Sequence, residues 1–477
     1  MTQYTVTFRP QGVAVSVSGG STVLQAQILA GLRPDAPCGG KGTCGKCRIM
    51  LDGQEVLACR TVVDRDMTVC TARQADMKIL TTGVQVKVQP DGADDYVLAF
   101  DIGTTTVVAY LLDGHTGTLL AQGSRMNPQG QFGADVISRI QYSIKAGNRE
   151  MAECIRSAMR ELAEETAQKA GIPSGKITAS AIVGNTAMHH LLLAIDPKPL
   201  VTPPYMPAVS SAIERSGARI LPNIAGFVGG DTVGCMVATR FDRLEELTLL
   251  IDIGTNGEMV LGDQKRRIAC STAAGPAFEG AKISCGMRGA EGAVDHVTLE
   301  NGRVSYHVIG GAAPRGLCGS GLLDLVAVLL ELGVIEESGR MKDKKFKLCD
   351  NVVLTQKDVR EVQLAKAAIR AGIELLSEKM GVPVADIRRV YLAGAFGNYM
   401  DPASACRIGM IPPVLQERIT PIGNAAGEGA KLCALSRAEF AYSSVLAAQT
   451  EFLELAGLPQ FQDRYVDALG FGEAEEP

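Results

Sequence analysis

The chain has 477 residues, more than one hydrophobic core usually organises, so its length predicts several domains. Apolar residues make up 46% and charged residues 21%, as in ordinary globular proteins, and no apolar run approaches the roughly 18 residues that cross a bilayer. The net charge is −5, and Lys and Arg are scattered along the chain, which argues against nucleic acid and membrane as partners. The N-terminus has neither a basic segment nor a long apolar stretch, so we expect a cytoplasmic protein.

Residues 1–82 are expected to form a small first domain. Apolar and polar residues alternate over residues 4–8 and 13–17, around a Pro-Gln-Gly turn, which predicts a β-hairpin. A helix is expected near residues 23–30. Residues 83–97 are polar and contain Pro-Asp-Gly, and we interpret them as a flexible linker.

The remainder of the chain contains an internal repeat. Asp101-Ile-Gly-Thr and Asp252-Ile-Gly-Thr each follow an apolar strand and precede another. The simplest interpretation is a multidomain α/β protein in which two similar subdomains, residues 98–248 and 249–435, face each other. Residues 436–477 are expected to be a helical C-terminal segment. The helices that we expect after the first domain cover residues 148–170, 321–332, 359–380 and 437–455.

A group of close-set cysteines is the strongest local signal in the first domain. Its members are Cys38, Cys44, Cys47 and Cys59. The intervening glycines allow the backbone to wrap around an inorganic cluster and to point N–H groups at its sulfides, which favours a [2Fe–2S] cluster over zinc. Zinc needs only four tetrahedral sulfurs and remains the alternative metal, and Cys70 remains the alternative fourth ligand. The stretch resembles the ferredoxin family of [2Fe–2S] domains, and this resemblance implies a β-grasp α+β domain.

The two Asp-x-Gly-Thr turns are suited to binding phosphate. Glycine permits close approach, threonine hydroxyls donate hydrogen bonds, and an aspartate can hold Mg²⁺ through water. As a pair the turns resemble the phosphate-1 and phosphate-2 loops of the superfamily of acetate and sugar kinases, heat-shock chaperones and actin. The resemblance implies ATP and Mg²⁺ as ligands, with Asp101 and Asp252 as catalytic carboxylates. The binding residues that it implies are Gly103, Thr104, Thr105, Thr106, Gly254, Thr255, Asn256 and Gly257.

Three further segments resemble parts of the same superfamily. Residues 390–398 are similar to its adenosine loop, which implies nucleotide contacts from Gly394, Ala395, Phe396 and Gly397. Residues 182–186 and 423–430 resemble its two connecting segments, whose small residues let helices cross closely at the hinge. Asp231 lies in a stretch similar to the one that supplies the catalytic carboxylate of sugar kinases, where it would orient or deprotonate a water. Its alternative role is a helix N-cap before Thr232.

The combination of both halves resembles one family in particular, the reductive activators of corrinoid proteins. The runs that carry the resemblance are Asp101–Thr106, Asn127–Gln129, Gly133–Arg139, Gly184–His190, Asp252–Glu258, Ala274–Gly280 and Ala393–Asn398. The connection between the cysteine-bearing domain and Asp101 is short. We therefore expect the additional linker and middle domains of larger members to be absent.

The resemblance implies a repair reaction on cobalt. One electron would pass from the [2Fe–2S] cluster to inactive Co(II) and restore the Co(I) state needed for methyl transfer, with ATP shifting a conformational equilibrium. The implied partners are a corrinoid methyl-carrier protein and an upstream donor such as a ferredoxin or flavoprotein, and a homodimer is left open. The alternatives are an activator of a radical dehydratase and a nucleotide-gated redox sensor. A small-molecule kinase is a weaker alternative, because kinase chemistry needs no iron–sulfur centre.

Overall fold

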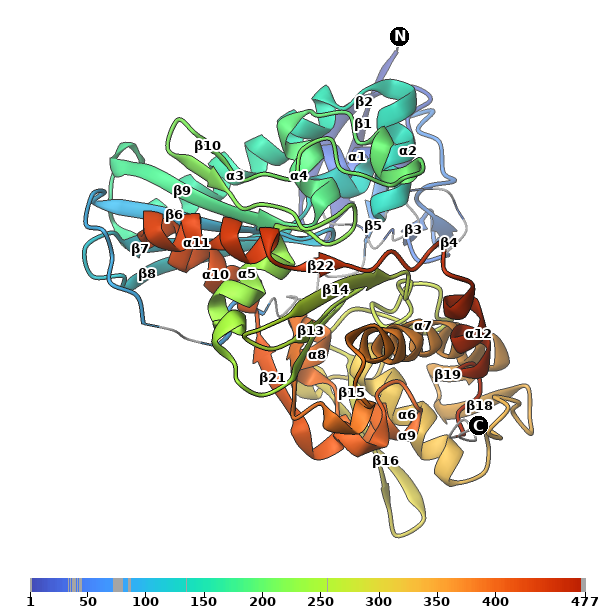
Figure 1. Cartoon of the computed structure of the whole chain (residues 1–477). Helices are drawn as coiled ribbons and strands as arrows, with labels where there is room; N and C mark the ends of the chain where they lie inside the picture. Colours follow the sequence, from blue (N-terminus) through green and yellow to red (C-terminus); the bar gives the residue numbers. More distant parts are fainter. Residues whose placement is uncertain are drawn as a thin grey trace.

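The computed structural model describes residues 2–32, 34, 36, 40, 42, 45–71, 80–84, 87–133, 135–254 and 256–472. Two α/β lobes are stacked one on the other, and the N-terminal domain lies beside the upper lobe (Figure 1). Strands and helices occur in every lobe, so the predicted multidomain α/β class is confirmed. Each of the lobes and the N-terminal domain has a hydrophobic cluster of its own, and a further cluster fills the space between the two large sheets.

The N-terminal domain is a five-stranded sheet with one helix. Its elements are β1 (Gln3–Arg9), β2 (Val13–Ser18), α1 (Val23–Leu29), β3 (Arg48–Leu51), β4 (Gln54–Leu57) and β5 (Met67–Cys70). The strand order is β2-β1-β5-β3-β4, with β1 and β2 antiparallel and β5 parallel to β1. The predicted hairpin is therefore confirmed. The helix starts where the Thr22 side chain accepts a hydrogen bond from the Gln25 backbone and the Gln25 side chain accepts one from Thr22.

Each lobe contains a six-stranded sheet, and the two sheets share the order of five strands, whereas the sixth strand, β10 or β22, lies at opposite edges. The upper sheet has the order β10 (Ile213–Arg215), β11 (Ala218–Ile220), β9 (Ile177–Gly184), β6 (Tyr96–Ile102), β7 (Thr106–Asp113), β8 (Leu119–Met126). The lower sheet has the order β21 (Ile419–Gly423), β20 (Arg389–Ala393), β12 (Thr248–Ile253), β13 (Gly257–Gly262), β14 (Arg267–Thr272), β22 (Glu451–Phe452). In the upper sheet, β6 pairs antiparallel with the next strand in the sequence, β7, and parallel with β9. In the lower sheet, β12 pairs in the same way with β13 and β20. The sequence repeat is thus a structural duplication.

The lower lobe carries smaller sheets besides the main one. They consist of β15 (Ala293–Glu300) with β16 (Arg303–Val308) and β17 (Gly316–Leu317), and of β18 (Lys345–Cys349) with β19 (Val352–Thr355).

Helices cover both large sheets. Those of the upper lobe are α2 (Val136–Ala146), α3 (Arg149–Ala170), α4 (Thr186–Leu193) and α5 (Gly230–Thr239). Those that follow are α6 (Gly319–Glu331), α7 (Gln356–Met380), α8 (Gly394–Tyr399), α9 (Pro402–Arg407), α10 (Ala425–Leu435), α11 (Arg437–Ala448) and α12 (Pro459–Asp467). Helices α5, α10 and α11 lie between the two sheets (Figure 1).

Glycines allow α5 and α10 to cross in direct contact. A Cβ on Gly429 would lie 2.0 Å from the carbonyl oxygen of Gly234, and a Cβ on Gly234 would lie 2.9 Å from that of Ala426. The sequence predicted a close crossing from the two connecting segments. The crossing that the structure shows joins the second of these segments to α5.

The C-terminal segment differs from its prediction. The helix expected over residues 437–455 ends at Ala448, where the Thr450 hydroxyl donates to the carbonyl of Leu446. Residues Glu451 and Phe452 then add β22 to the lower sheet, parallel to β14. The carboxylate of Glu451 pairs with the guanidinium of Arg266, at 2.8 and 2.9 Å. This long-range pairing overrides the local helical pattern, so the segment is not purely helical.

The connection between the N-terminal domain and β6 was expected to be a flexible coil, and this expectation is wrong for its described residues. The amide of Asn424 donates to the carbonyl of Thr82, and the amide of Gly83 donates to the carboxylate of Glu428. Further along, Asp91 accepts from the backbone of Arg437 at 2.6 Å. The polar composition of the connection did not indicate these hydrogen-bond partners, because they lie more than three hundred residues away in the sequence.

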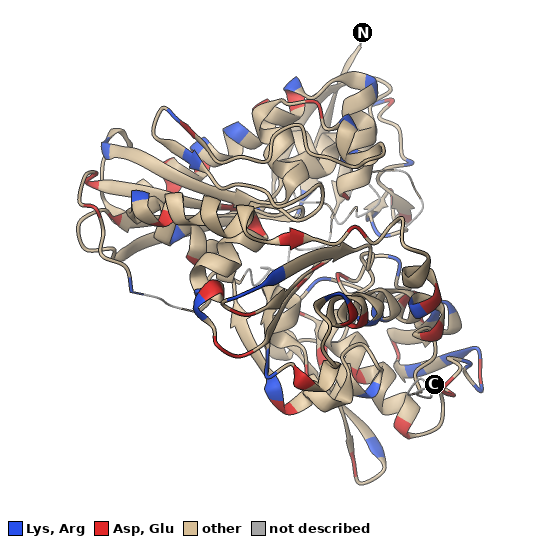
Figure 2. Cartoon of the chain, viewed as in Figure 1, with Lys and Arg blue, Asp and Glu red and all other residues tan. Residues whose placement is uncertain are grey.

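Charged residues of both signs are interspersed along the chain in both lobes (Figure 2). None of the helices in the described ranges combines the length and the apolar character that a membrane crossing requires.

Candidate nucleotide and cluster site

Three carboxylates predicted from the sequence meet where the two lobes face each other. Asp101 lies near the end of β6, Asp252 near the end of β12, and Asp231 in the first turn of α5. Burial raises the pKa of both Asp101 and Asp252 to about 6, and the charge of Asp101 adds to the shift of Asp252. Burial and the charge of Asp252 raise the pKa of Asp231. Such a group of desolvated carboxylates favours a cation or a bound proton.

The alternative role of Asp231 as a helix N-cap is wrong. The N-cap of α5 is Gly229, and Asp231 is the second helical residue, with its carboxylate accepting from the Thr232 amide at 2.8 Å. The helix starts earlier than the sequence indicated because the backbone at Gly229 lies against Thr186, where a Cβ would be 2.5 Å from the amide nitrogen.

The phosphate-1 loop connects β6 to β7. The amide of Gly103 donates to the carbonyl of Thr106 at 2.8 Å and closes the turn. The Asn127 side chain donates to the carbonyl of Gly103 at 2.8 Å. The hydroxyl of Thr105 donates across the cleft to the carboxylate of Glu279 at 3.1 Å. The four predicted residues of this loop therefore lie together beside Asp101.

Arg139 contacts the backbone of the phosphate-1 loop and was not predicted as a site residue from the sequence. Its guanidinium is 1% exposed and donates to the carbonyls of Thr104 at 2.6 Å and Gly133 at 2.9 Å. Burial lowers its pKa to about 10, so it stays charged at neutral pH. Its place at the end of the run Gly133–Arg139, one of those that carry the family resemblance, was the signal available for finding it.

The phosphate-2 loop connects β12 to β13. The amide of Gly254 donates to the carbonyl of Asn256 at 2.9 Å, Gly257 begins β13, and the predicted residue Thr255 lies outside the described residues. The Asn256 side chain donates to Glu258, which also accepts from Asn185 of the upper lobe, both at 3.3 Å. Burial, together with the charges of two site aspartates, raises the pKa of Glu258. Glu258 is a fourth site carboxylate that the sequence analysis missed.

The adenosine loop joins β20 to α8. All four predicted residues, Gly394, Ala395, Phe396 and Gly397, lie in the first turn of α8. Gly394 has φ +80°, and a Cβ there would lie 2.6 Å from Oδ1 of Asp252, so the loop backbone abuts the phosphate side. The ring of Phe396 stacks on that of Phe278, with centroids 4.7 Å apart.

Asn424, at the start of α10, connects this site to the hinge. Its side-chain nitrogen donates to the carboxylate of Asp101 at 2.8 Å and to the hydroxyl of Tyr110 at 3.0 Å. Its side-chain oxygen accepts from the amide of Gly427 and caps α10. The second connecting segment thus contacts a predicted catalytic residue directly.

Of the four predicted cluster ligands, Cys47 and Cys59 are described, whereas Cys38 and Cys44 lie outside the described residues. Cys47 and Cys59 are buried in one core, brought together by the hydrogen bond from the Ala58 amide to the Cys47 carbonyl at 2.8 Å. Cys70 is exposed at the end of β5. Gly40 has φ +83°, and a Cβ there would lie 3.9 Å from that of Cys59, so the loop backbone closes on this thiol. Two adjacent buried thiols under a glycine-lined loop fit a sulfur-ligated metal cluster.

A cleft of 1930 Å³ extends from the described cysteines of the N-terminal domain, Cys70 included, to the phosphate-1 loop. It is lined by Cys47 and Cys59 from the N-terminal domain, by Thr104 and Thr105 from the phosphate-1 loop, and by Glu279 from the lower lobe. Among the described side chains, no three acidic, histidine or cysteine groups converge closely enough to hold a metal ion directly. A cation at the carboxylates would therefore be held partly by water or phosphate.

This architecture defines a class of protein: an actin-like ATPase with duplicated subdomains, preceded by a ferredoxin-like domain. Residues 246–476 match the family model described as the C-terminal domain of RACo, the ASKHA domain, and residues 96–244 match the model of the RACo middle region. The middle region is thus present, which corrects the expectation that it is missing.

Individual relatives agree with the family models. The chain is 38% identical over 420 residues to the corrinoid activation enzyme RamQ of Eubacterium limosum, which covers 79% of this chain and 70% of that protein. It is 32% identical over 225 residues to the [Co(II) methylated amine-specific corrinoid protein] reductase of Methanosarcina barkeri, covering 43% of this chain and 42% of that protein. The solved structure of a reductive activator for corrinoid, iron-sulfur protein matches with a TM-score of 0.70 and 30% identity over 98% of both chains. The chain belongs to this family of corrinoid-activating enzymes, as the sequence analysis predicted.

Proposed function

We propose that this enzyme uses ATP to drive one electron from a [2Fe–2S] cluster onto the Co(II) of a corrinoid-binding methyl-carrier protein. The product is Co(I), the state that accepts a methyl group. The family membership supports the reaction class, and the arrangement of the site supports the division of labour among residues.

The nucleotide half of this proposal assigns a task to each loop. The phosphate-1 and phosphate-2 loops would hold the phosphates, and α8 would lie under the adenosine. Asp101 and Asp252 would hold Mg²⁺ through water, because each lies near the end of the central strand of its own lobe, β6 or β12, and the charge of Asp101 acts on Asp252. Asp231 would accept the proton of the attacking water, and the raised pKa of its carboxyl makes it a stronger base than an exposed aspartate.

The cluster half of the proposal assigns Cys38, Cys44, Cys47 and Cys59 as ligands. The burial of Cys59 beside Cys47, compared with the exposure of Cys70, supports this choice of fourth ligand. A [2Fe–2S] cluster supplies a one-electron donor at about −400 mV in plant-type ferredoxins. If the cobalt acceptor lies roughly 180 mV lower, the transfer costs about 4 kcal/mol, which nucleotide binding or hydrolysis could offset.

One observation carries the proposal: Cys47 and Cys59, the two described cysteines of the proposed ligand set, line the same cleft as Thr104 and Thr105 of the phosphate-1 loop. A binding event at Thr105 therefore takes place in the space that the cluster faces. Neither a small-molecule kinase nor a free-standing ferredoxin would require that proximity.

The decisive experiment is an anaerobic mixture of reduced holoprotein, MgATP and a carrier protein loaded with cob(II)alamin. We expect the absorption of Co(I) to appear only when nucleotide is present, and D101A or D252A to abolish this dependence while the cluster spectrum persists. If both variants reduce cobalt as the unmodified protein does, the nucleotide site takes no part in the chemistry.

Three further assignments belong to the same proposal. A ferredoxin or a flavoprotein would re-reduce the cluster in the cytoplasm. The functional units would be residues 1–82, 98–248 and 249–435, with residues 83–97 joining the first two. Sedimentation of the holoprotein at several concentrations decides whether two copies associate.

A further inference from the structure

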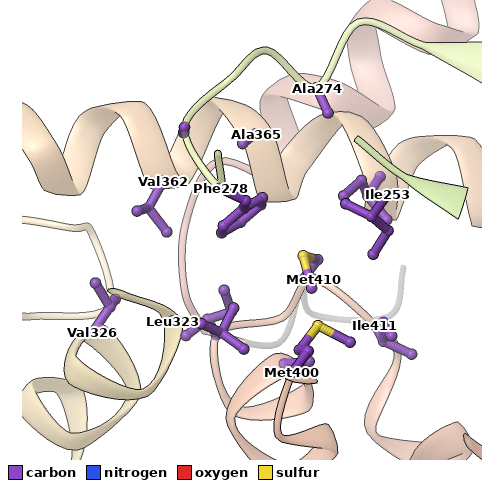
Figure 3. Close-up of a cluster of buried hydrophobic side chains, with 14 of the residues drawn as sticks. Ile253, Ala274, Phe278, Leu323, Val326, Val362, Ala365, Met400, Met410 and Ile411 are labelled. Carbon is purple, nitrogen blue, oxygen red and sulfur yellow. The ribbon is translucent and has the colours of Figure 1, made fainter. Parts of the chain in front are cut away.

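One segment of the lower lobe, residues 274–287, contacts both the nucleotide loops and the described end of the cysteine-bearing loop, residues 45–47, which we call the cluster loop. It leaves β14, runs along the shared cleft and leads towards β15. Ala274 and Phe278 point into the hydrophobic cluster of the lower lobe, together with Leu323 and Val362 (Figure 3). The segment is therefore fixed at one end in a packed core while its other residues face the cleft.

The first contact joins this segment to the cluster loop. The ammonium of Lys46, which directly precedes Cys47, donates to the carbonyl of Gly280 at 2.5 Å and to that of Gly286. The two carbonyls converge because neither residue has a side chain: a Cβ on Gly286 would lie 2.3 Å from the carbonyl oxygen of Gly280. A lysine that satisfies two converging carbonyls is a specific anchor between the two domains.

The second contact joins the same segment to the phosphate-1 loop. Glu279, the neighbour of Gly280, accepts from the hydroxyl of Thr105 at 3.1 Å. This is the hydroxyl that the proposed function assigns to a phosphate of ATP. An anionic phosphate and the Glu279 carboxylate cannot both occupy it, since like charges at that distance repel and the hydroxyl has one proton to donate.

The third contact reaches the adenosine loop. Phe278 stacks on Phe396 with an interplanar angle of 14°. Gly319 leaves room for the Phe396 ring and for the Phe278 backbone, because a Cβ there would lie 2.8 Å from that ring and 2.1 Å from the carbonyl oxygen of Phe278. Consecutive residues 278, 279 and 280 thus contact the adenosine loop, the phosphate-1 loop and the cluster loop in turn.

We propose that residues 276–287 form an internal docking surface for the cluster loop, with Lys46 as its anchor, and that MgATP loosens this docking by displacing Glu279 from Thr105. This inference rests on the proposed nucleotide site and adds its regulation. Without nucleotide, the cluster loop is held against the lower lobe. With nucleotide, the segment moves and the loop is released for the encounter with the partner.

Thermodynamic linkage between nucleotide binding and docking gives a quantitative prediction. If nucleotide weakens docking, loss of docking must strengthen nucleotide binding by the same factor. We expect K46M to bind the non-hydrolysable analogue MgAMP-PNP at least about 5-fold more tightly than the unmodified holoprotein, at the lower end of typical coupling. E279A removes the competing carboxylate of the lower lobe and should also bind MgAMP-PNP more tightly than the unmodified holoprotein. K265M, at an exposed position of the β13–β14 turn, is the matched control and should leave the affinity unchanged.

A direct measurement of docking uses the reactivity of Lys46 itself. Full-length holoprotein is treated briefly with acetic anhydride, with and without MgAMP-PNP, and acetylation of Lys46 and Lys265 is quantified by mass spectrometry. We expect nucleotide to increase the labelling of Lys46 several-fold and not that of Lys265. In E279A, labelling should be high already without nucleotide. Iron content and the cluster spectrum of each variant establish that the cluster is present.

Two results would overturn the inference alone: equal Lys46 labelling with and without nucleotide in a protein that binds MgAMP-PNP, or unchanged nucleotide affinity in both K46M and E279A. In either case Co(I) formation could still depend on ATP, so the proposed function would stand. A holoprotein with no measurable affinity for adenine nucleotide would overturn both.

Discussion

At the scale of single residues, the buried carboxylates of the site repel one another, and binding of a cation would relieve this repulsion. Asp101 and Asp252 lie on two different strands, yet the charge of one raises the pKa of the other. Arg139 lies on the opposite side of the phosphate-1 loop, where its charge is taken up by backbone carbonyls. The charges of these buried carboxylates are therefore disfavoured by burial and by mutual repulsion, and in the proposed function the Mg²⁺ that accompanies ATP would offset them.

Replacing Asp252 by Asn should stabilise the nucleotide-free protein at neutral pH. In the unfolded chain the Asp252 carboxyl loses its proton near pH 4, whereas in the folded chain its pKa is about 6. The folded state is thus penalised progressively as pH rises from about 4 to about 6, and fully above that range. A shift of this size corresponds to at most about 3 kcal/mol at pH 7.5, a gain that should vanish below about pH 4.

Thermal melts of D252N and the unmodified protein between pH 4.5 and 8, without nucleotide, measure this difference. D463N, at an exposed position of α12, is the control and should follow the unmodified protein. Addition of MgATP should raise the melting temperature of the unmodified protein and of D463N, but not that of D252N. Parallel melting curves for D252N and the unmodified protein over the whole range would contradict the account.

At the scale of elements, α5 and α10 cross in direct contact within the hydrophobic cluster between the two large sheets. Because a Cβ on Gly429 would meet the backbone of Gly234 at 2.0 Å, G429A must push the helices apart. Overpacking of this kind costs about 1–3 kcal/mol, and a domain of this size loses roughly 2–4 °C of melting temperature per kcal/mol. We expect G429A to melt about 2–12 °C lower and to bind MgATP more weakly.

The matched substitution for this test is G457A. No atom lies within 4 Å of a Cβ at Gly457, and its φ is not in the left-handed region. Differential scanning calorimetry and nucleotide titration of both variants distinguish a specific clash from a general cost of replacing glycine. Equal melting temperatures for G429A and G457A would mean that the helices separate without cost.

The elements also show how far sequence reasoning extends. The hairpin, the duplicated Asp-x-Gly-Thr turns and the adenosine loop were predictable because local patterns specify them. Glu258, Glu279 and Asn424 were not, because each acts through a partner on another lobe or loop. The end of α11 was mispredicted for the same reason, since the pairing of Glu451 with Arg266 decides it.

At the scale of the whole molecule, the connection before β6 ties the N-terminal domain to the hinge. Gly83 forms an isolated bridge with Gly423, and the amide of Val84 donates to the carbonyl of Ile422 at 3.1 Å. The next residue along this strand, Asn424, contacts Asp101. A displacement of Asp101 would therefore reach the connection through the side chain of Asn424. This is a second route between the nucleotide site and the N-terminal domain, besides the proposed docking surface.

Glu428 is the side chain that holds this connection, and its removal should expose the segment to protease. Its carboxylate is 7% exposed, accepts from the amide of Gly83 at 3.1 Å and pairs with Lys431 at 2.5 Å. Loss of a charged hydrogen bond costs about 1.5–3 kcal/mol, which multiplies the population of the open connection by roughly ten or more. Because cleavage follows the open population when closing is fast, trypsin should cut after the exposed Lys87 at least about 5-fold faster in E428A.

Two further variants serve as controls for this cleavage. E428Q keeps an acceptor for the amide of Gly83 and should be cut at an intermediate rate. K87Q in the E428A background removes the cleavage site, so the new fragment should disappear. Equal cleavage of E428A and the unmodified protein would show that backbone pairing alone holds the connection, so that the carboxylate has no part in joining the two domains.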